Sequence, residues 1–106
     1  MVDDQDVRAA LERVCSRLRT TPEARLVRAD DRLDGSSVAD AVHEAAAWAA
    51  SKQGVGHPVP RLHPLASADQ LSVVGGDFLD WAGAADDRVG ELEGWRLRIE
   101  RLRVVT

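Results

Sequence analysis

The chain is poor in the residues that cross-link small proteins or anchor their cores. It contains one cysteine, Cys15, so no internal disulfide bond can form. It has no tyrosine and one phenylalanine, which leaves three tryptophans as the main large side chains. The longest uncharged apolar run, residues 45–50, is far too short to span a bilayer. The acidic stretch MVDDQD resembles neither a signal peptide nor a transit peptide, so a reducing cytoplasm is the expected location.

Positive charge is also scarce. Lys and Arg number 14 against 18 Asp and Glu, which gives a net charge of −4. Such a chain is repelled, on average, by nucleic-acid phosphates and by anionic lipid. All basic residues except Lys52 are arginine, and alanine is abundant. We interpret this bias as GC-rich coding, as in many bacteria, and assign no function to it.

The 106 residues suit one domain, 1–106, with a modest core. Hydrophobic periodicity predicts an all-α fold, a small helical bundle. Its four main helices are expected at 4–20, 37–53, 67–82 and 87–103. A short helix is also expected after Pro22, and Ser67 is expected to open a capping box with Gln70.

Two segments leave an α+β alternative open, with strands near 25–29 and 95–105. In the second segment, Trp95, Leu97 and Ile99 alternate with arginines, as in a half-buried strand. Gly90 and Gly94 also weaken a helix there. We favour the helix because its spacing matches more positions over a longer window.

The stretch GVGHPVPRLHP lies in a predicted connector, residues 54–66. Three prolines in seven residues prevent a helix and disfavour a strand, so the segment is expected to be a semi-rigid link. Leu62 and Leu65 are expected to hold it against the core.

No catalytic or metal-binding pattern is apparent. His57 and His63 are six residues apart with prolines between them, unlike the close ligand pairs of structural zinc sites. Cys15 lies at the edge of an apolar stripe and is expected to be a buried, inert thiol. Asp77 and Asp80 are expected on the solvated side of a helix. We therefore expect no enzyme activity, no metal and no cofactor.

The last helix carries a wide apolar surface. Leu97 and Val104 lie off its main stripe, whose members are Val89, Leu92, Trp95, Ile99 and Leu102. A monomer is expected to leave Leu97 and part of Trp95 in water, and such patches often mark contacts. We therefore predict a homodimer, with Trp95 and Leu97 near the interface and Arg96 and Arg98 at its rim. Gly76 is expected to allow a close backbone approach, within the chain or across the dimer.

The function that these patterns favour is a non-catalytic interaction or self-association module. The alternative is a small nucleic-acid-associated regulator that uses the C-terminal arginines, Arg96, Arg98, Arg101 and Arg103. Acids open this helix and arginines close it, which the helix dipole alone explains, so we favour the interaction module.

Overall fold

A computed structural model describes residues 3–54, 56 and 58–106. Within these residues the fold is all-α and contains no strand, so the α+β alternative is wrong. The long helices are α1 (Asp4–Arg19), α3 (Val38–Lys52), α4 (Ser67–Gly83) and α5 (Arg88–Val105), joined by α2 (Glu23–Val27) and two short 3-10 turns, η1 (Asp31–Leu33) and η2 (Pro64–Ala66). The predicted bounds of the four main helices agree with these to within two residues.

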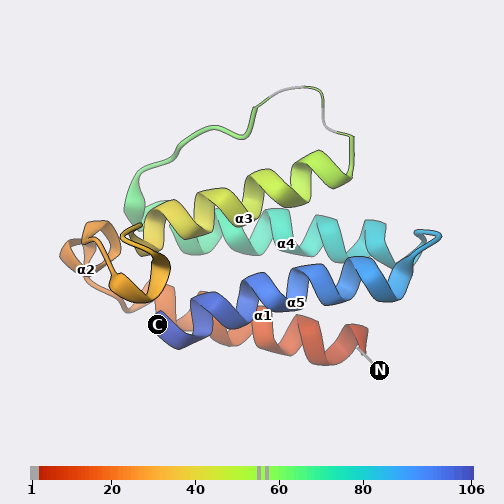
Figure 1. Ribbon diagram of the computed structural model, residues 1–106, viewed down its shortest axis with the longest axis horizontal. Coiled ribbons are helices and arrows are strands. Elements are labelled where there is room, and N and C mark those ends of the chain that lie inside the picture. The colour runs from red at the N-terminus through yellow and green to blue at the C-terminus, as the bar shows by residue number, and fades with distance from the viewer. Residues whose placement is uncertain (1–2, 55, 57) are drawn as a thin grey trace.

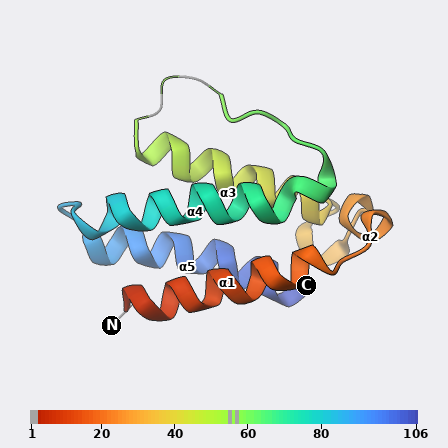
Figure 2. The ribbon, with the colours of Figure 1, turned by 180° about the vertical axis from the view of Figure 1, so that it is seen from behind.

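The four long helices form a bundle in which α1 and α5 run one way and α3 and α4 run the other (Figure 1). Around the bundle, α1 packs on α4, α4 on α3, α3 on α5 and α5 on α1. The turn between α4 and α5 is short and makes them antiparallel. The connector between α3 and α4 is long and returns along the bundle, so α4 starts beside the start of α3 and runs parallel to it (Figure 2).

The starts of α3 and α4 are formed differently. Ser37 and Asp40 form a capping box at α3, in which each side chain accepts a backbone N–H of the other residue. The capping box predicted at Ser67 is wrong. Pro64 begins the turn η2, which continues directly into α4, so that Ser67 lies inside the helix and is buried.

The core is built from one stripe of each long helix and is centred on Phe78 and Trp95, both fully buried. Val89, which the sequence placed on the α5 stripe, is exposed. Val89 lies in the first turn of α5, close to the turn that joins α4 to α5, where this side of the helix does not yet pack against the core. The buried stripe of α5 is instead Leu92, Trp95, Ile99, Leu102 and Val105.

The double glycine does not interrupt α4, but only one of its members allows close packing. A methyl group on Gly75 would lie 2.8 Å from side-chain atoms of both Leu11 and Trp95. A methyl group on Gly76 would have nothing within 4 Å. The prediction that Gly76 allows a close approach is therefore wrong within the chain, because Gly75 is the residue that faces the core.

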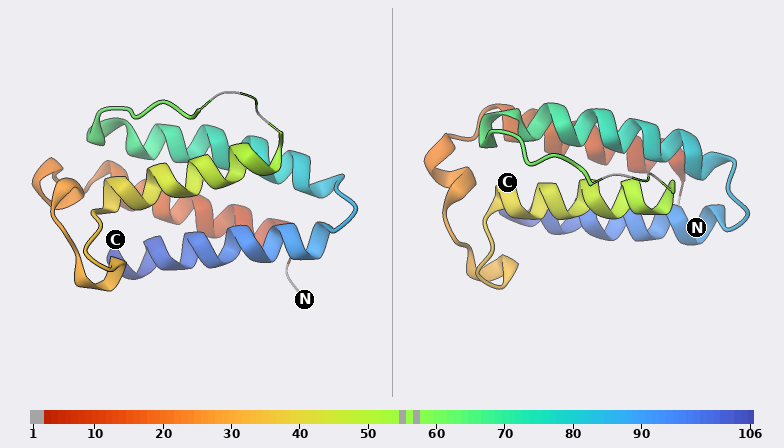
Figure 3. Two further views of the ribbon diagram at one scale, coloured as in Figure 1. Left: turned by 45° about the horizontal axis from the view of Figure 1, so that its top comes forward. Right: turned by 90° about the horizontal axis from the view of Figure 1, so that it is seen from above.

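The connector runs along the outer side of α3 and α4 (Figure 3). Leu62 and Leu65 do not hold it to the core, since both are exposed. Polar contacts hold it instead. The ring nitrogen Nε2 of His43 lies 3.1 Å from the carbonyl oxygen of Val59, and Gln70 donates a 2.9 Å hydrogen bond to that of Pro60. These side chains come from α3 and α4, so the connector is tied to both helices.

Candidate functional site

Trp95, predicted near an interface, is 0% exposed. Its ring stacks on that of Trp48, with centroids 6.3 Å apart, and lies 5.3 Å from that of Phe78. The expectation that part of Trp95 remains in water is wrong, because side chains from α3 and α4 cover the ring. Trp95 is therefore a core residue with no surface to offer a partner.

Leu97 is exposed, as expected, and Val104 accompanies it. The two side chains are 55% and 52% exposed. They are seven residues apart, which places them on the same side of α5 and about 10 Å apart along its axis. Glu100 and Arg101 lie between them and are exposed as well. We call these four residues, Leu97, Glu100, Arg101 and Val104, the α5 outer face.

Arg96 and Arg98 leave α5 on opposite sides of Leu97. Arg96 is paired with Glu93 and, like it, lines a hollow on the α1 side. Arg98 turns towards α3, where its guanidinium carbon lies 4.0 Å from the ring centroid of Trp48. A nitrogen of the same group is 3.6 Å from Glu44. The two predicted rim residues thus flank Leu97, with Arg98 committed to packing on Trp48.

The other two arginines of α5 are also paired with carboxylates. Arg103 donates to Glu100, which holds the pKa of that carboxyl group below its ordinary value. Arg101 lies 3.5 Å from Asp34, at the end of η1. All four C-terminal arginines therefore have acidic partners, and they do not form a net-basic face.

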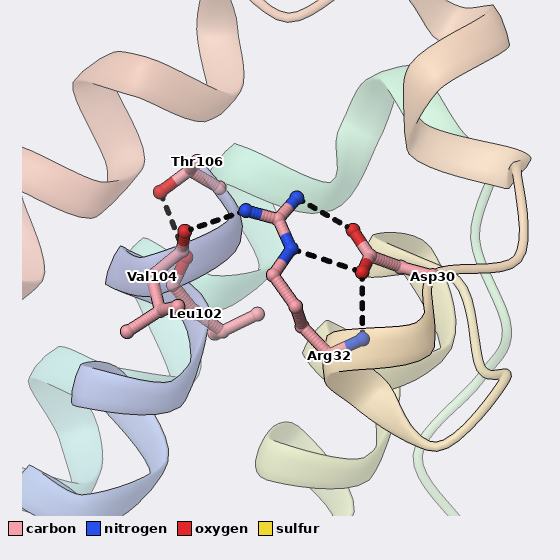
Figure 4. A network of polar contacts seen from close by, with 5 residues as sticks. All are labelled: Asp30, Arg32, Leu102, Val104 and Thr106. Carbon is pink, nitrogen blue, oxygen red and sulfur yellow. Dashed lines mark hydrogen bonds and ion pairs between the residues drawn. The ribbon is translucent and has the colours of Figure 1, made fainter.

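The C-terminal end of α5 is held by a residue that the sequence analysis did not single out. Arg32, in η1, donates a 3.2 Å hydrogen bond to the carbonyl oxygen of Val104 while its other nitrogens bind Asp30 (Figure 4). The hydroxyl of Thr106 donates to the carbonyl oxygen of Leu102. The last turn of α5 therefore has partners for two of its end carbonyl groups, and the Val104 end of the outer face is held in place.

Gly76 is far from this face in the bundle. It lines a small hollow of about 150 Å³ between α1 and α4, together with residues such as Arg8 and Leu11. α5 contributes nothing to that hollow. The structure therefore does not bring Gly76 together with Leu97.

The part of the chain that the structure describes holds no group of three or more His, Cys, Asp or Glu side chains placed to bind a metal ion. His57 lies outside the described residues. His63 has a local role, because its Nδ1 accepts the backbone N–H of Leu65 and its Nε2 lies 3.0 Å from Glu23. Burial raises the pKa of the Cys15 thiol, which disfavours the reactive thiolate.

Asp77 and Asp80 lie on the exposed side of α4, as expected. Asp80 receives a 2.8 Å hydrogen bond from Arg8 of α1. Neither carboxylate is enclosed in the way that a catalytic acid requires.

Comparison with known protein families, curated proteins and solved structures finds no match to this chain. Among the described residues, no helix combines the length and the apolar character needed to cross a membrane.

Proposed function

We propose that this protein is a non-catalytic self-association module, in which the α5 outer face binds the same face of a second copy. The observation that carries the proposal is the exposure of Leu97 and Val104 on one side of a single helix. A twofold dimer is the commonest way for a soluble protein to cover such a surface.

The order of the residues along the face favours an antiparallel pair of α5 helices. In that arrangement, Leu97 of one copy lies opposite Val104 of the other. With the twofold axis between Glu100 and Arg101, each Glu100 then faces an Arg101 of the second copy. A parallel arrangement would instead place like charges opposite each other, which is unfavourable.

The expected dimer is weak. Each of the four apolar side chains is already half covered in the monomer, so its full burial contributes about 1 kcal/mol, roughly half the usual value for an exposed side chain. Neighbouring apolar atoms and two exposed ion pairs add to this. After the cost of association, we expect a dissociation constant no tighter than about the millimolar range.

Two further elements of the proposal concern the location of the protein and the alternative of nucleic-acid binding. A cytoplasmic location fits a single, buried cysteine. Nucleic-acid binding through the C-terminal arginines ranks lower, because carboxylates neutralise each of them in the structure. A salt-dependent mobility shift with mixed DNA and RNA distinguishes this alternative from self-association.

Light scattering over about a hundredfold range of protein concentration tests the proposal. The wild-type mass should rise towards that of a dimer, whereas Leu97→Glu should remain a monomer because it places two carboxylates in the apolar contact. Val73→Glu is the matched control, since Val73 is equally exposed but lies on α4. A wild-type monomer at every concentration would exclude the dimer, and a dimer unchanged in Leu97→Glu would exclude this location.

A further inference from the structure

A second surface, distant from the α5 outer face, contains a hollow between the connector and the two helices that it crosses. The hollow has a volume of about 450 Å³. Its apolar lining comes from α3, the connector and α4, and consists of Ala50, Val59, Pro60, Leu62, Val73 and Val74. Val73 and Leu62 are 64% and 43% exposed, so the apolar surface is open to solvent.

The polar side chains that line this hollow are two carboxylates and two amides, Asp69, Asp77, Gln53 and Gln70. Each amide nitrogen uses one of its two N–H groups within the chain. Gln53 donates to the carbonyl oxygen of Ala49, and Gln70 donates to that of Pro60. The carboxylates and the amide oxygens therefore provide most of the side-chain groups left to a ligand, and they are hydrogen-bond acceptors.

The charge of the lining is negative. Among the described residues, no lysine or arginine lines the hollow. Asp69 lies 3.6 Å from Arg19, whereas Asp77 forms no ion pair within the described part of the chain. An anionic ligand would therefore meet the unpaired carboxylate of Asp77, whereas a cation would find that carboxylate and the amide oxygens as acceptors.

From these observations we propose that the hollow binds a small organic ammonium ion with an apolar body. The apolar body packs against Val73, Val74 and Leu62, and the ammonium group donates hydrogen bonds to Asp77 and the neighbouring amide oxygens. A pocket of this volume is within the usual range for small-molecule sites, whose lining is mostly apolar with a few polar groups that orient the ligand. The hollow is open and the ligand small, so the expected affinity is in the millimolar range.

The experiment uses three ligands of matched shape. They are 2-phenylethylammonium, 3-phenylpropanoate and 2-phenylethanol, which present a cation, an anion and a neutral group on the same aromatic body. Each is titrated into ¹⁵N-labelled protein near physiological salt, which screens long-range attraction. The cation should shift amide resonances of residues 59–62 and 69–77, and it should bind about tenfold more tightly than the anion. Absence of binding, equal affinity for all three, or shifts spread over the whole surface would overturn the proposal.

Two variants assign the site. Val73→Arg places a cationic side chain in the hollow and should weaken binding of the ammonium ion about tenfold or more. Asp77→Asn should reduce the preference for the cation over the neutral alcohol. The matched control is Val104→Arg, since Val104 is also more than half exposed but lies on the α5 outer face, and this variant should bind the ammonium ion as the wild type does. Unchanged binding in Val73→Arg would overturn the assignment. Val104→Arg also disrupts the proposed dimer contact. Ammonium binding that persists in this variant therefore does not depend on self-association.

Discussion

At the scale of single residues, two helix glycines each lie against the ring of a tryptophan. Gly75 of α4 contacts Trp95, and a methyl group on Gly94 of α5 would lie 2.9 Å from Trp48. Trp48 and Trp95 are themselves stacked. The two glycines thus let large rings pack between the helices of a chain that has few other large side chains.

The neighbouring glycines of α4 provide a matched test of this packing. Gly75→Ala should lower stability by about 1–3 kcal/mol, because the new methyl group would press on the rigid, buried ring of Trp95. Gly76→Ala should raise stability by up to about 1 kcal/mol, because alanine is the better helix former and the space is open. Thermal unfolding of both variants should give melting temperatures on opposite sides of the wild type. The same direction of change in both would contradict the packing described here.

The sequence contained the signal that separates these two glycines. Gly75 follows Leu71 by four residues and precedes Phe78 by three, so it lies on the buried stripe of α4, whereas Gly76 does not.

The complete burial of Trp95 was harder to predict than its position on the α5 stripe. It depends on Trp48 and Phe78, which reach the ring from other helices, and periodicity within one helix carries no information about them.

At the scale of elements, the start of α3 depends on the capping box of Ser37 and Asp40. The backbone N–H of Ser37 donates to the Asp40 carboxylate, and this bond, helped by Arg61, lowers the pKa of Asp40. The charged carboxylate is therefore favoured in the folded protein relative to the unfolded chain. Its stabilisation is complete above the unfolded pKa, about 3.9, and is lost as the pH falls through the lower folded value.

Asp40→Asn should therefore be less stable than the wild type at about pH 6, and the difference should shrink as the pH falls below about 4. Urea unfolding of both proteins across this pH range measures the difference directly. A difference that stays constant with pH would show that the carboxylate charge has no role in capping α3.

The four main helices could be predicted because each has a stripe of apolar residues at helical spacing, most clearly Val7, Leu11, Val14 and Leu18 in α1. The glycines of α5 counted against a helix in the sequence analysis. The close contact that Gly94 makes with Trp48 could not be foreseen from the sequence. The bond from Arg32 to Val104 was also beyond prediction, since 72 residues separate the two and no local pattern links them.

At the scale of the whole molecule, the two proposed surfaces lie on different sides of the bundle. The connector crosses α3 and α4 at one side, and α5 lies at the other, beside α1 (Figure 1). A second copy on the α5 outer face would leave the connector hollow open. Self-association and binding of an ammonium ion are therefore expected to be independent of each other.

Only part of the α5 outer face was predictable. The exposure of Leu97 followed from its position off the main stripe, and its flanking arginines followed from their neighbouring positions. The position of Val104 off the stripe was predicted in the same way, but the contribution of Glu100 and Arg101 required the structure, because it depends on which side of α5 the other three helices cover.

A charge-reversal cycle analysed by sedimentation equilibrium tests most directly whether α5 pairs with itself in an antiparallel register, as we propose. Glu100→Arg and Arg101→Glu should each weaken the dimer about tenfold, because each places like charges opposite one another twice across the twofold axis. The double variant, Glu100→Arg with Arg101→Glu, should restore the wild-type dissociation constant to within about threefold, since the opposite charges face each other again. Single variants that dimerise like the wild type, or a double variant no better than the singles, would contradict the account.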